Sequence, residues 1–120
     1  MKMTTDLRTR WAGSGASSAS DSEKAGSEAC LAAVAGRPDA ALLVVFASDA
    51  HDMTALTGAI RAAAPDVPLI GCSTAGEIGS SGAGDSGVVV MALGGPGFAI
   101  ATATADVGEL GLREAGARVA

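Results

Sequence analysis

Two short apolar runs, separated by a helical pattern, dominate the hydrophobic pattern of this chain. Residues 40–47 (AALLVVFA) are continuously apolar, and residues 67–72 (VPLIGC) form a second, shorter run. Runs of this length are typical of strands buried on both faces of a sheet. Between them, Met53, Leu56 and Ile60 recur at spacings of three and four, which predicts a helix with one buried face. Together the three segments predict a β-α-β unit with parallel strands and a right-handed crossover.

Weaker patterns precede this unit. Residues 10–16 are small and partly apolar, and they are a weak strand candidate. The acidic and hydroxyl residues at 20–23 are typical of a helix start, because their side chains accept bonds from the first free amides. They predict a helix over residues 22–35, which Gly36 and Pro38 end. Asp49 or Asp52 is expected to cap the helix inside the β-α-β unit in the same way.

A glycine-rich stretch at residues 73–86 separates the unit from the last part of the chain, and residues 82–87 are expected to be a flexible turn. Residues 87–93 and 98–105 are strand-like and joined by a short Gly/Pro linker, which predicts an antiparallel hairpin. A further helix is expected from residue 108 onward. The expected fold class is therefore α/β. Its mixed β-sheet contains a parallel β-α-β unit, with strands near 40–47 and 67–72, followed by an antiparallel hairpin.

Length and composition narrow the possible classes. A chain of 120 residues forms one domain at most, and 48% hydrophobic residues favour a globular one. A net charge of −5 and only 2% aromatic residues argue against nucleic-acid binding. No apolar run approaches a membrane span and no signal-peptide pattern opens the chain, so no membrane partner and a cytoplasmic location are expected. Cys30 and Cys72 lack zinc spacing and are interpreted as reduced residues in or near the core.

The candidate site lies where the two parallel strands end. The carboxyl ends of parallel strands meet at one edge of a sheet, where open α/β sheets hold their ligands. The residues expected to face one another across this crevice, as ligand-binding residues, are Ser48, Asp49, His51, Cys72, Ser73, Thr74, Gly76 and Glu77. The alternative interpretation is that the glycines only form a turn and the charged side chains are solvated.

Two motifs match catalytic or nucleotide-binding patterns only in part. Residues 82–87 fit GxGxxG, but a strand follows them where a dinucleotide site needs a helix. Residues 71–75 resemble a nucleophile elbow around Ser73, yet the last glycine is replaced and the only histidine, His51, precedes the serine. Neither pattern predicts a catalytic residue, and no second ligand at metal spacing accompanies His51. We therefore expect a non-enzyme without a metal site.

Residues 38–46 and 67–78 (VPLIGCSTAGEI) resemble the N-terminal FIST sensory domain, and the segment 71–77 is the most specific part of the likeness. The resemblance covers most of residues 11–107. It implies a signal-transduction input that binds a small ligand, such as an amino acid, and that is paired with a C-terminal FIST partner domain. It also implies that residues 10–120 form a domain incomplete at its C-terminus, after a poorly ordered segment at 1–9.

Three functions remain open from the sequence: a small-molecule sensor, a haem-based nitric oxide sensor using His51, and a small serine hydrolase using Ser73. The first is preferred, and no cofactor is expected. For an amino-acid ligand, Glu77 and Asp49 would accept the ammonium group. Backbone amides near residues 73–76, with the Ser73 and Thr74 hydroxyls, would hold the carboxylate.

Overall fold

The computed structural model of the chain describes residues 9–79, 82–84 and 86–120. The expectation of a poorly ordered segment at residues 1–9 falls almost wholly outside this range. In chain order the helices and strands are β1 (Trp11–Ser17), α1 (Ser22–Val34), β2 (Ala40–Ser48), α2 (Met53–Ala63), β3 (Leu69–Thr74), β4 (Glu77–Gly79), β5 (Gly82–Gly84), β6 (Val88–Gly94) and α3 (Gly111–Val119). None of the helices in the described ranges has the length and apolar character that a membrane crossing requires.

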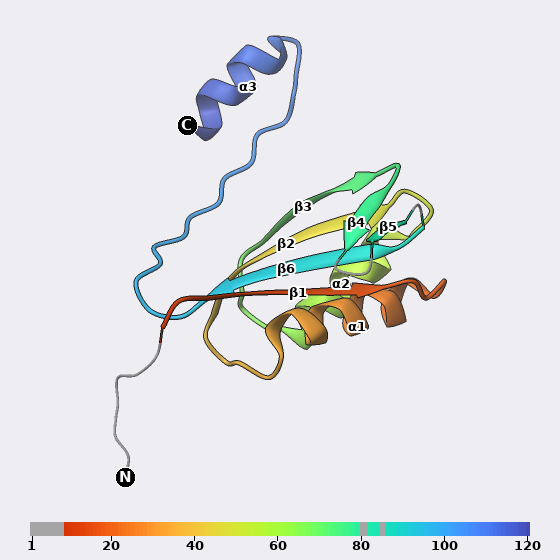
Figure 1. Cartoon of the computed structure of the whole chain (residues 1–120). Helices are drawn as coiled ribbons and strands as arrows, with labels where there is room; N and C mark the ends of the chain where they lie inside the picture. The colour runs from red at the N-terminus through yellow and green to blue at the C-terminus, as the bar shows by residue number, and fades with distance from the viewer. Residues whose placement is uncertain (1–8, 80–81, 85) are drawn as a thin grey trace.

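The main sheet has the strand order β1-β6-β2-β3 and is mixed (Figure 1). β2 and β3 are parallel and are connected through α2, whereas β6 runs antiparallel to both β1 and β2. The α/β class, the mixed sheet and the parallel β-α-β unit predicted from the apolar runs are confirmed. The weak strand candidate at residues 10–16 is also a strand, and it forms one edge of the sheet as β1.

Aspartate side chains start the first two helices. The Asp21 carboxylate accepts a bond of 2.8 Å from the Lys24 amide at the start of α1. Asp52, one of the two cap candidates, accepts from the amides of Thr54 and Ala55 at 3.0 and 3.1 Å. These bonds satisfy amides that the first helical turn leaves without partners. α1 ends where Ala35 adopts a left-handed conformation with φ of 50°.

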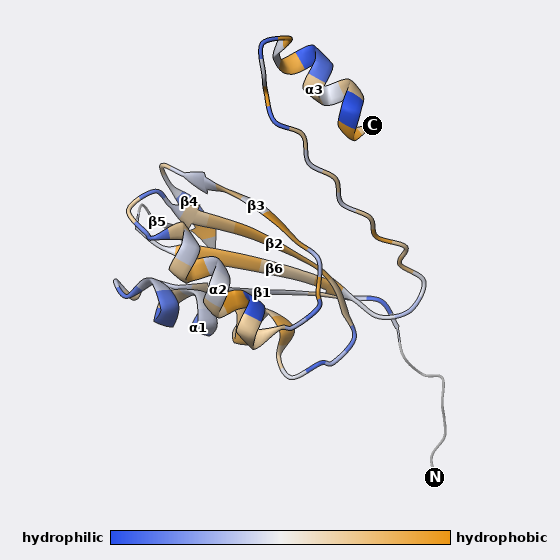
Figure 2. Ribbon diagram, turned by 180° about the vertical axis from the view of Figure 1, so that it is seen from behind, coloured by the Kyte–Doolittle hydropathy of each residue, from blue (hydrophilic) through white to orange (hydrophobic). Residues whose placement is uncertain are grey.

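The hydrophobic core lies on one side of the sheet only. Both α1 and α2 cover this side, and the apolar strips of β2 and β6 run beneath them (Figure 2). Leu56 and Ile60 of α2 are fully buried, as the helical spacing predicted, and they belong to the same core cluster as Leu43 of β2 and Val90 of β6. No helix of the described chain packs on the opposite side, which we call the open face (Figure 1).

Small residues let α1 lie unusually close to β1. A Cβ atom at Gly15 would overlap the carbonyl oxygen of Ala29 and would lie 2.7 Å from the Ala32 Cβ atom. Gly13 faces Ala33 of α1 in the same way. Because contact at this distance is possible only without a side chain, the glycines of β1 set the spacing between helix and sheet.

Trp11, the single tryptophan of the chain, lies at the end of the sheet where β1 and β2 begin and β6 ends. Its indole Nε1 donates a 2.9 Å bond to Asp39, just before β2, and the Arg37 guanidinium stacks 4.3 Å from the ring centre. The ring also covers Gly94 at the end of β6, where a Cβ atom would collide with it. Trp11 therefore ties the ends of β1, β2 and β6 together.

The predicted hairpin is wrong in its second strand. Residues 87–93 form β6, but residues 98–108 carry neither helix nor strand. The reason is that both edges of β6 are already occupied, by β1 on one side and β2 on the other. The glycine-rich stretch also differs from a simple turn, since β4 and β5 pair within it as a two-stranded antiparallel ladder. The helix expected from residue 108 is present as α3, which stands clear of the sheet (Figure 1).

Candidate functional site

Glu77 is a buried carboxylate with both oxygens engaged. Its side chain is 5% exposed. One oxygen accepts a 2.5 Å bond from the Thr74 hydroxyl, and the other accepts a 2.9 Å bond from the amide of Gly87. Thr74 and Glu77, both among the residues expected to face one crevice, are in direct contact. Their bonds fasten the β4–β5 ladder to the end of β3 and the start of β6, and they engage both oxygens of Glu77 within the protein.

His51 belongs to a second cluster, at the start of the two core helices. Its Nδ1 lies 3.0 Å from the hydroxyl of Ser22, and the same hydroxyl accepts a 3.0 Å bond from the Asp52 amide. Ser48 is also buried, and its hydroxyl accepts from the Ala50 amide at 3.2 Å. The participation of Ser22 was missed, because nothing in the sequence brings residue 22 to residue 51. These side chains join α1 to the β2–α2 connection.

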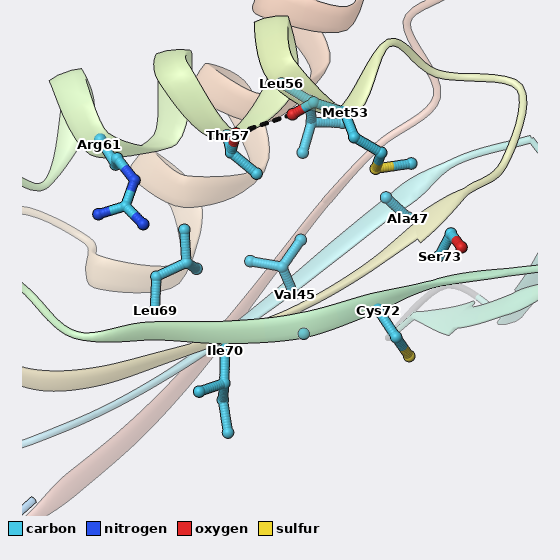
Figure 3. A pocket seen from close by; sticks show the side chains of 11 residues that line it. Val45, Ala47, Met53, Leu56, Thr57, Arg61, Leu69, Ile70, Cys72 and Ser73 are labelled. Carbon is cyan, nitrogen blue, oxygen red and sulfur yellow. Dashed lines mark hydrogen bonds between the residues drawn. The ribbon is translucent and has the colours of Figure 1, made fainter. Parts of the chain in front are cut away.

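The residues expected to share one crevice therefore lie in several separate places. Asp49 and Gly76 are exposed at its rim. Cys72 and Ser73 point to opposite faces of β3, because successive side chains of a strand alternate (Figure 3). Cys72 is exposed on the open face, so its interpretation as a core or near-core residue is wrong, whereas Cys30 is buried as expected. Burial raises the pKa of the Cys30 thiol.

A cavity of about 310 Å³ lies between α2 and β3, on the core side of the sheet (Figure 3). It opens beside β3, the edge strand of the sheet, which no further strand of the described chain continues. The cavity is mostly apolar with a few polar groups, and its lining consists of Val45, Ala47, Met53, Leu56, Thr57, Arg61, Leu69, Ile70, Gly71, Cys72 and Ser73. The side chains of Ile70 and Cys72 point away from it, to the open face (Figure 3).

The polar groups of the cavity come from both walls. Arg61 reaches from the last turn of α2 toward Leu69, and Ser73 lies at the opposite end (Figure 3). The Thr57 hydroxyl is already bonded to the Met53 carbonyl at 2.8 Å. The sequence contains one signal for the side of the cavity formed by α2. Met53, Thr57 and Arg61 are spaced by four, and this spacing places residues on one helix face.

Backbone groups of β3 also face the cavity side of the sheet edge. The carbonyls of Pro68 and Thr74 accept bonds from Leu43 and Asp49 on the β2 side. Amides and carbonyls alternate in direction along a strand, so those of the intervening odd-numbered residues, Ser73 included, point to the outer edge. No strand of the described chain pairs with that edge. The cavity thus offers one guanidinium and the Ser73 hydroxyl, which makes no hydrogen bond within the described residues, around an apolar space, and the outward backbone groups lie along the adjacent sheet edge.

The structure does not bring together the two residues named in the alternative functions. Ser73 makes no hydrogen bond to His51 within the described residues, and no histidine or carboxylate lines the cavity. His51 lies outside the cavity lining, and its Nε2 is buried with no hydrogen-bond partner among the described residues. Among the described residues, no three His, Cys, Asp or Glu side chains gather as metal ligands would.

Comparison with protein families gives one match. The profile of the FIST N domain matches residues 41–120, which run from the second residue of β2 through α3. The matched range includes α2, β3 and the whole cavity lining, whereas β1 and α1 precede it. A search of curated proteins found no match.

Proposed function

The chain belongs to the FIST N domain family of sensory signal-transduction domains, and from that premise we propose that it senses a small molecule bound in the cavity between α2 and β3. The cavity is the observation that supports this proposal. At about 310 Å³ it falls at the lower end of the range typical of small-molecule sites, which are mostly apolar with a few oriented polar groups. An amino acid or another small acid has a suitable size.

The lining favours a ligand with a carboxylate and an aliphatic body. Arg61 is the only charged residue in the lining, so the cavity attracts an anion. A guanidinium also binds carboxylates through paired hydrogen bonds. Leu69, Met53 and Val45 provide apolar contact for a branched side chain. This is the chemistry of a short branched carboxylic acid, including an aliphatic amino acid such as leucine.

An ammonium group would find a different acceptor from the one expected from the sequence. Both oxygens of Glu77 are bonded within the protein, and neither Glu77 nor Asp49 lines the cavity. The remaining acceptors are the Ser73 hydroxyl and the backbone carbonyls on the outer edge of β3. Neutral acceptors bind an ammonium less strongly than a carboxylate does. We therefore place most of the binding energy at Arg61 and the apolar walls.

The test is calorimetric titration of the chain with leucine, 4-methylpentanoate and leucinamide. Leucine and 4-methylpentanoate share the carboxylate, and leucinamide lacks it. We expect the two acids to bind and the amide to bind at least about tenfold more weakly, since a hydrogen bond to a charged group contributes roughly 1.5–3 kcal/mol. Arg61→Met should weaken both acids by a similar factor.

Lys24→Met is the matched control, because it removes one exposed positive charge from α1, away from the cavity. It should leave the affinities unchanged. If Arg61→Met folds and binds both acids like the parent chain, or if leucinamide binds as well as leucine, the cavity does not recognise a carboxylate. If neither acid binds the parent chain, the proposed ligand class is wrong.

A further inference from the structure

The open face of the sheet carries a continuous set of exposed apolar side chains. Two rows cross it in register, one formed by Cys72, Phe46 and Val89 and the other by Ile70, Val44 and Met91. Ile70 is 46% exposed, Phe46 39% and Met91 38%. Large apolar side chains gathered in this way on one surface indicate an interaction site.

The second apolar surface lies on α3, where Leu112 and Val119 are exposed. They share one face of the helix with Gly116 and with Ala115, and Ala115 is itself buried. Leu112 is 77% exposed and Val119 41%. The other face is polar, with a 3.5 Å ion pair between Glu114 and Arg118. An amphipathic helix of this kind is stable in water chiefly when its apolar face packs against another surface.

An extended segment connects the two surfaces. Arg10 fixes the start of this segment by donating to the carbonyls of Pro96 and Gly97 at 3.3 and 3.4 Å. From there residues 98–108 run without regular structure and carry α3 clear of the sheet, past the edge formed by β3 (Figures 1 and 2). Eleven residues in extended form span about 35 Å.

We propose that the chain forms a two-fold dimer in which α3 of each copy packs its apolar face on the open face of the other copy. Exchange of one terminal element between identical chains is a common route to closed dimers. In this arrangement Leu112 and Val119 of one copy contact Ile70, Phe46 and Met91 of the other.

The dimensions of the two surfaces agree with this docking. α3 has nine residues and is about 13 Å long. The open face is about 30 Å long along the nine residues of β2 and is four strands wide, so the helix fits within it.

The occupant is a second copy because the structure holds α3 away from its own sheet. The segment 98–108 leaves the domain at the anchored corner beside Arg10 and stays extended, which directs α3 outward (Figure 1). Reciprocal exchange also buries both helices and both open faces at once. One nine-residue helix buries little area alone, and a stable interface requires about 1,200–2,000 Å² in total.

Cys72 provides a built-in probe, since it lies on the open face and the only other cysteine, Cys30, is buried. The experiment combines sedimentation equilibrium with the rate at which a thiol reagent modifies Cys72, over a range of protein concentrations. We expect a dimer whose Cys72 reacts at least about tenfold more slowly at high than at low concentration, following mass action. Leu112→Glu should give a monomer with fast-reacting Cys72, and Ile70→Glu should also give a monomer.

Leu31→Glu is the matched control, because Leu31 is an equally apolar residue, 53% exposed, on α1 at the other side of the sheet. It should leave the dimer intact. An equal mixture of the Leu112→Glu and Ile70→Glu variants should form a weaker dimer, since one intact helix and one intact face remain.

Three results would overturn the proposal. The first is a parent chain that stays monomeric with an accessible Cys72. The second is protection of Cys72 that does not depend on concentration, which would mean that α3 covers its own sheet. The third is a dimer that persists in both glutamate variants. Leu112 is exposed on α3 and outside the core, so Leu112→Glu tests the contact even if Ile70→Glu disturbs folding.

Discussion

Adding one methyl group at Gly15 should destabilise the fold strongly, while the same addition at Gly58 should stabilise it. Alanine has a higher propensity than glycine for both strand and helix, so local propensity predicts a gain at both positions. The structure reverses the sign at Gly15. There the new Cβ atom would overlap the Ala29 carbonyl oxygen and lie 2.7 Å from both the Ala32 Cβ atom and the Ala33 amide nitrogen.

The magnitude follows from which atoms have to move. Carbon atoms in contact lie about 3.5–4.0 Å apart, so α1 must retreat from β1 by about 1 Å. The obstructing atoms belong mainly to the helix backbone, which cannot rotate away as a side chain can. Overpacking costs typically 1–3 kcal/mol, and we expect about 3 kcal/mol here because fully buried Ala29 and Cys30 also lose contacts. At Gly58, within α2, nothing lies within 4 Å, and alanine should add about 0.5–1 kcal/mol.

The assay is urea unfolding of the parent chain and both variants, followed by far-ultraviolet circular dichroism. The midpoint should fall for Gly15→Ala and rise for Gly58→Ala, with similar slopes, because the surface exposed on unfolding is nearly unchanged. In thermal unfolding the Gly15→Ala midpoint should fall by roughly 10 °C or more, given about 4–8 °C per kcal/mol for a domain of this size. A Gly15→Ala variant as stable as the parent would show that α1 does not pack on β1 at the spacing described.

Three further predictions concern single side chains. Asp52→Ala should lower the free energy of unfolding by about 1 kcal/mol in urea titrations, because α2 loses the cap that two amides use, whereas the exposed Asp49→Ala should change little. Glu77→Gln should accelerate hydrogen exchange at the Gly87 amide by about tenfold or more, since that amide loses a carboxylate acceptor. Unchanged exchange would contradict the described hydrogen bond between Glu77 and the Gly87 amide. In dilute native protein a thiol reagent should modify Cys72 alone, and Cys30 should react only after denaturant is added, because it is buried and its pKa is raised; rapid reaction of two thiols without denaturant would refute this.

Local patterns in the sequence were sufficient for the elements whose structure depends on near neighbours. The apolar run at residues 40–47, the stripe of Leu56 and Ile60 and the capping aspartates each act over a few residues, and all are found as predicted. The strand predicted at residues 98–105 is absent, because strand pairing depends on residues that are distant in sequence. β1, near the start of the chain, takes the edge of β6 that the hairpin would have needed.

The candidate site was predicted only in part, for two physical reasons. Side chains alternate along a strand, so Cys72 and Ser73 point to opposite faces even though they are adjacent in sequence. The prediction had placed both residues in one crevice. Arg61 was missed because a charged residue at a helix end usually extends into solvent, and only the uncovered edge of β3 creates a cavity beside it. Thr74 and Glu77 were each expected to contact a ligand, whereas in the structure the end of β3 and the start of β4 bring them into contact with each other.

The position of Trp11 gives this fold a spectroscopic asymmetry. With no tyrosine and two phenylalanines in the chain, nearly all near-ultraviolet absorption and emission comes from one indole. That indole is stacked under Arg37 and bonded to Asp39 at the junction of β1 with the start of β2. A change in its emission therefore reports the detachment of the edge strand β1. Ligand binding in the cavity beside β3, at the opposite edge of the sheet, should leave the emission unchanged, so fluorescence and calorimetry would follow two independent events in one molecule.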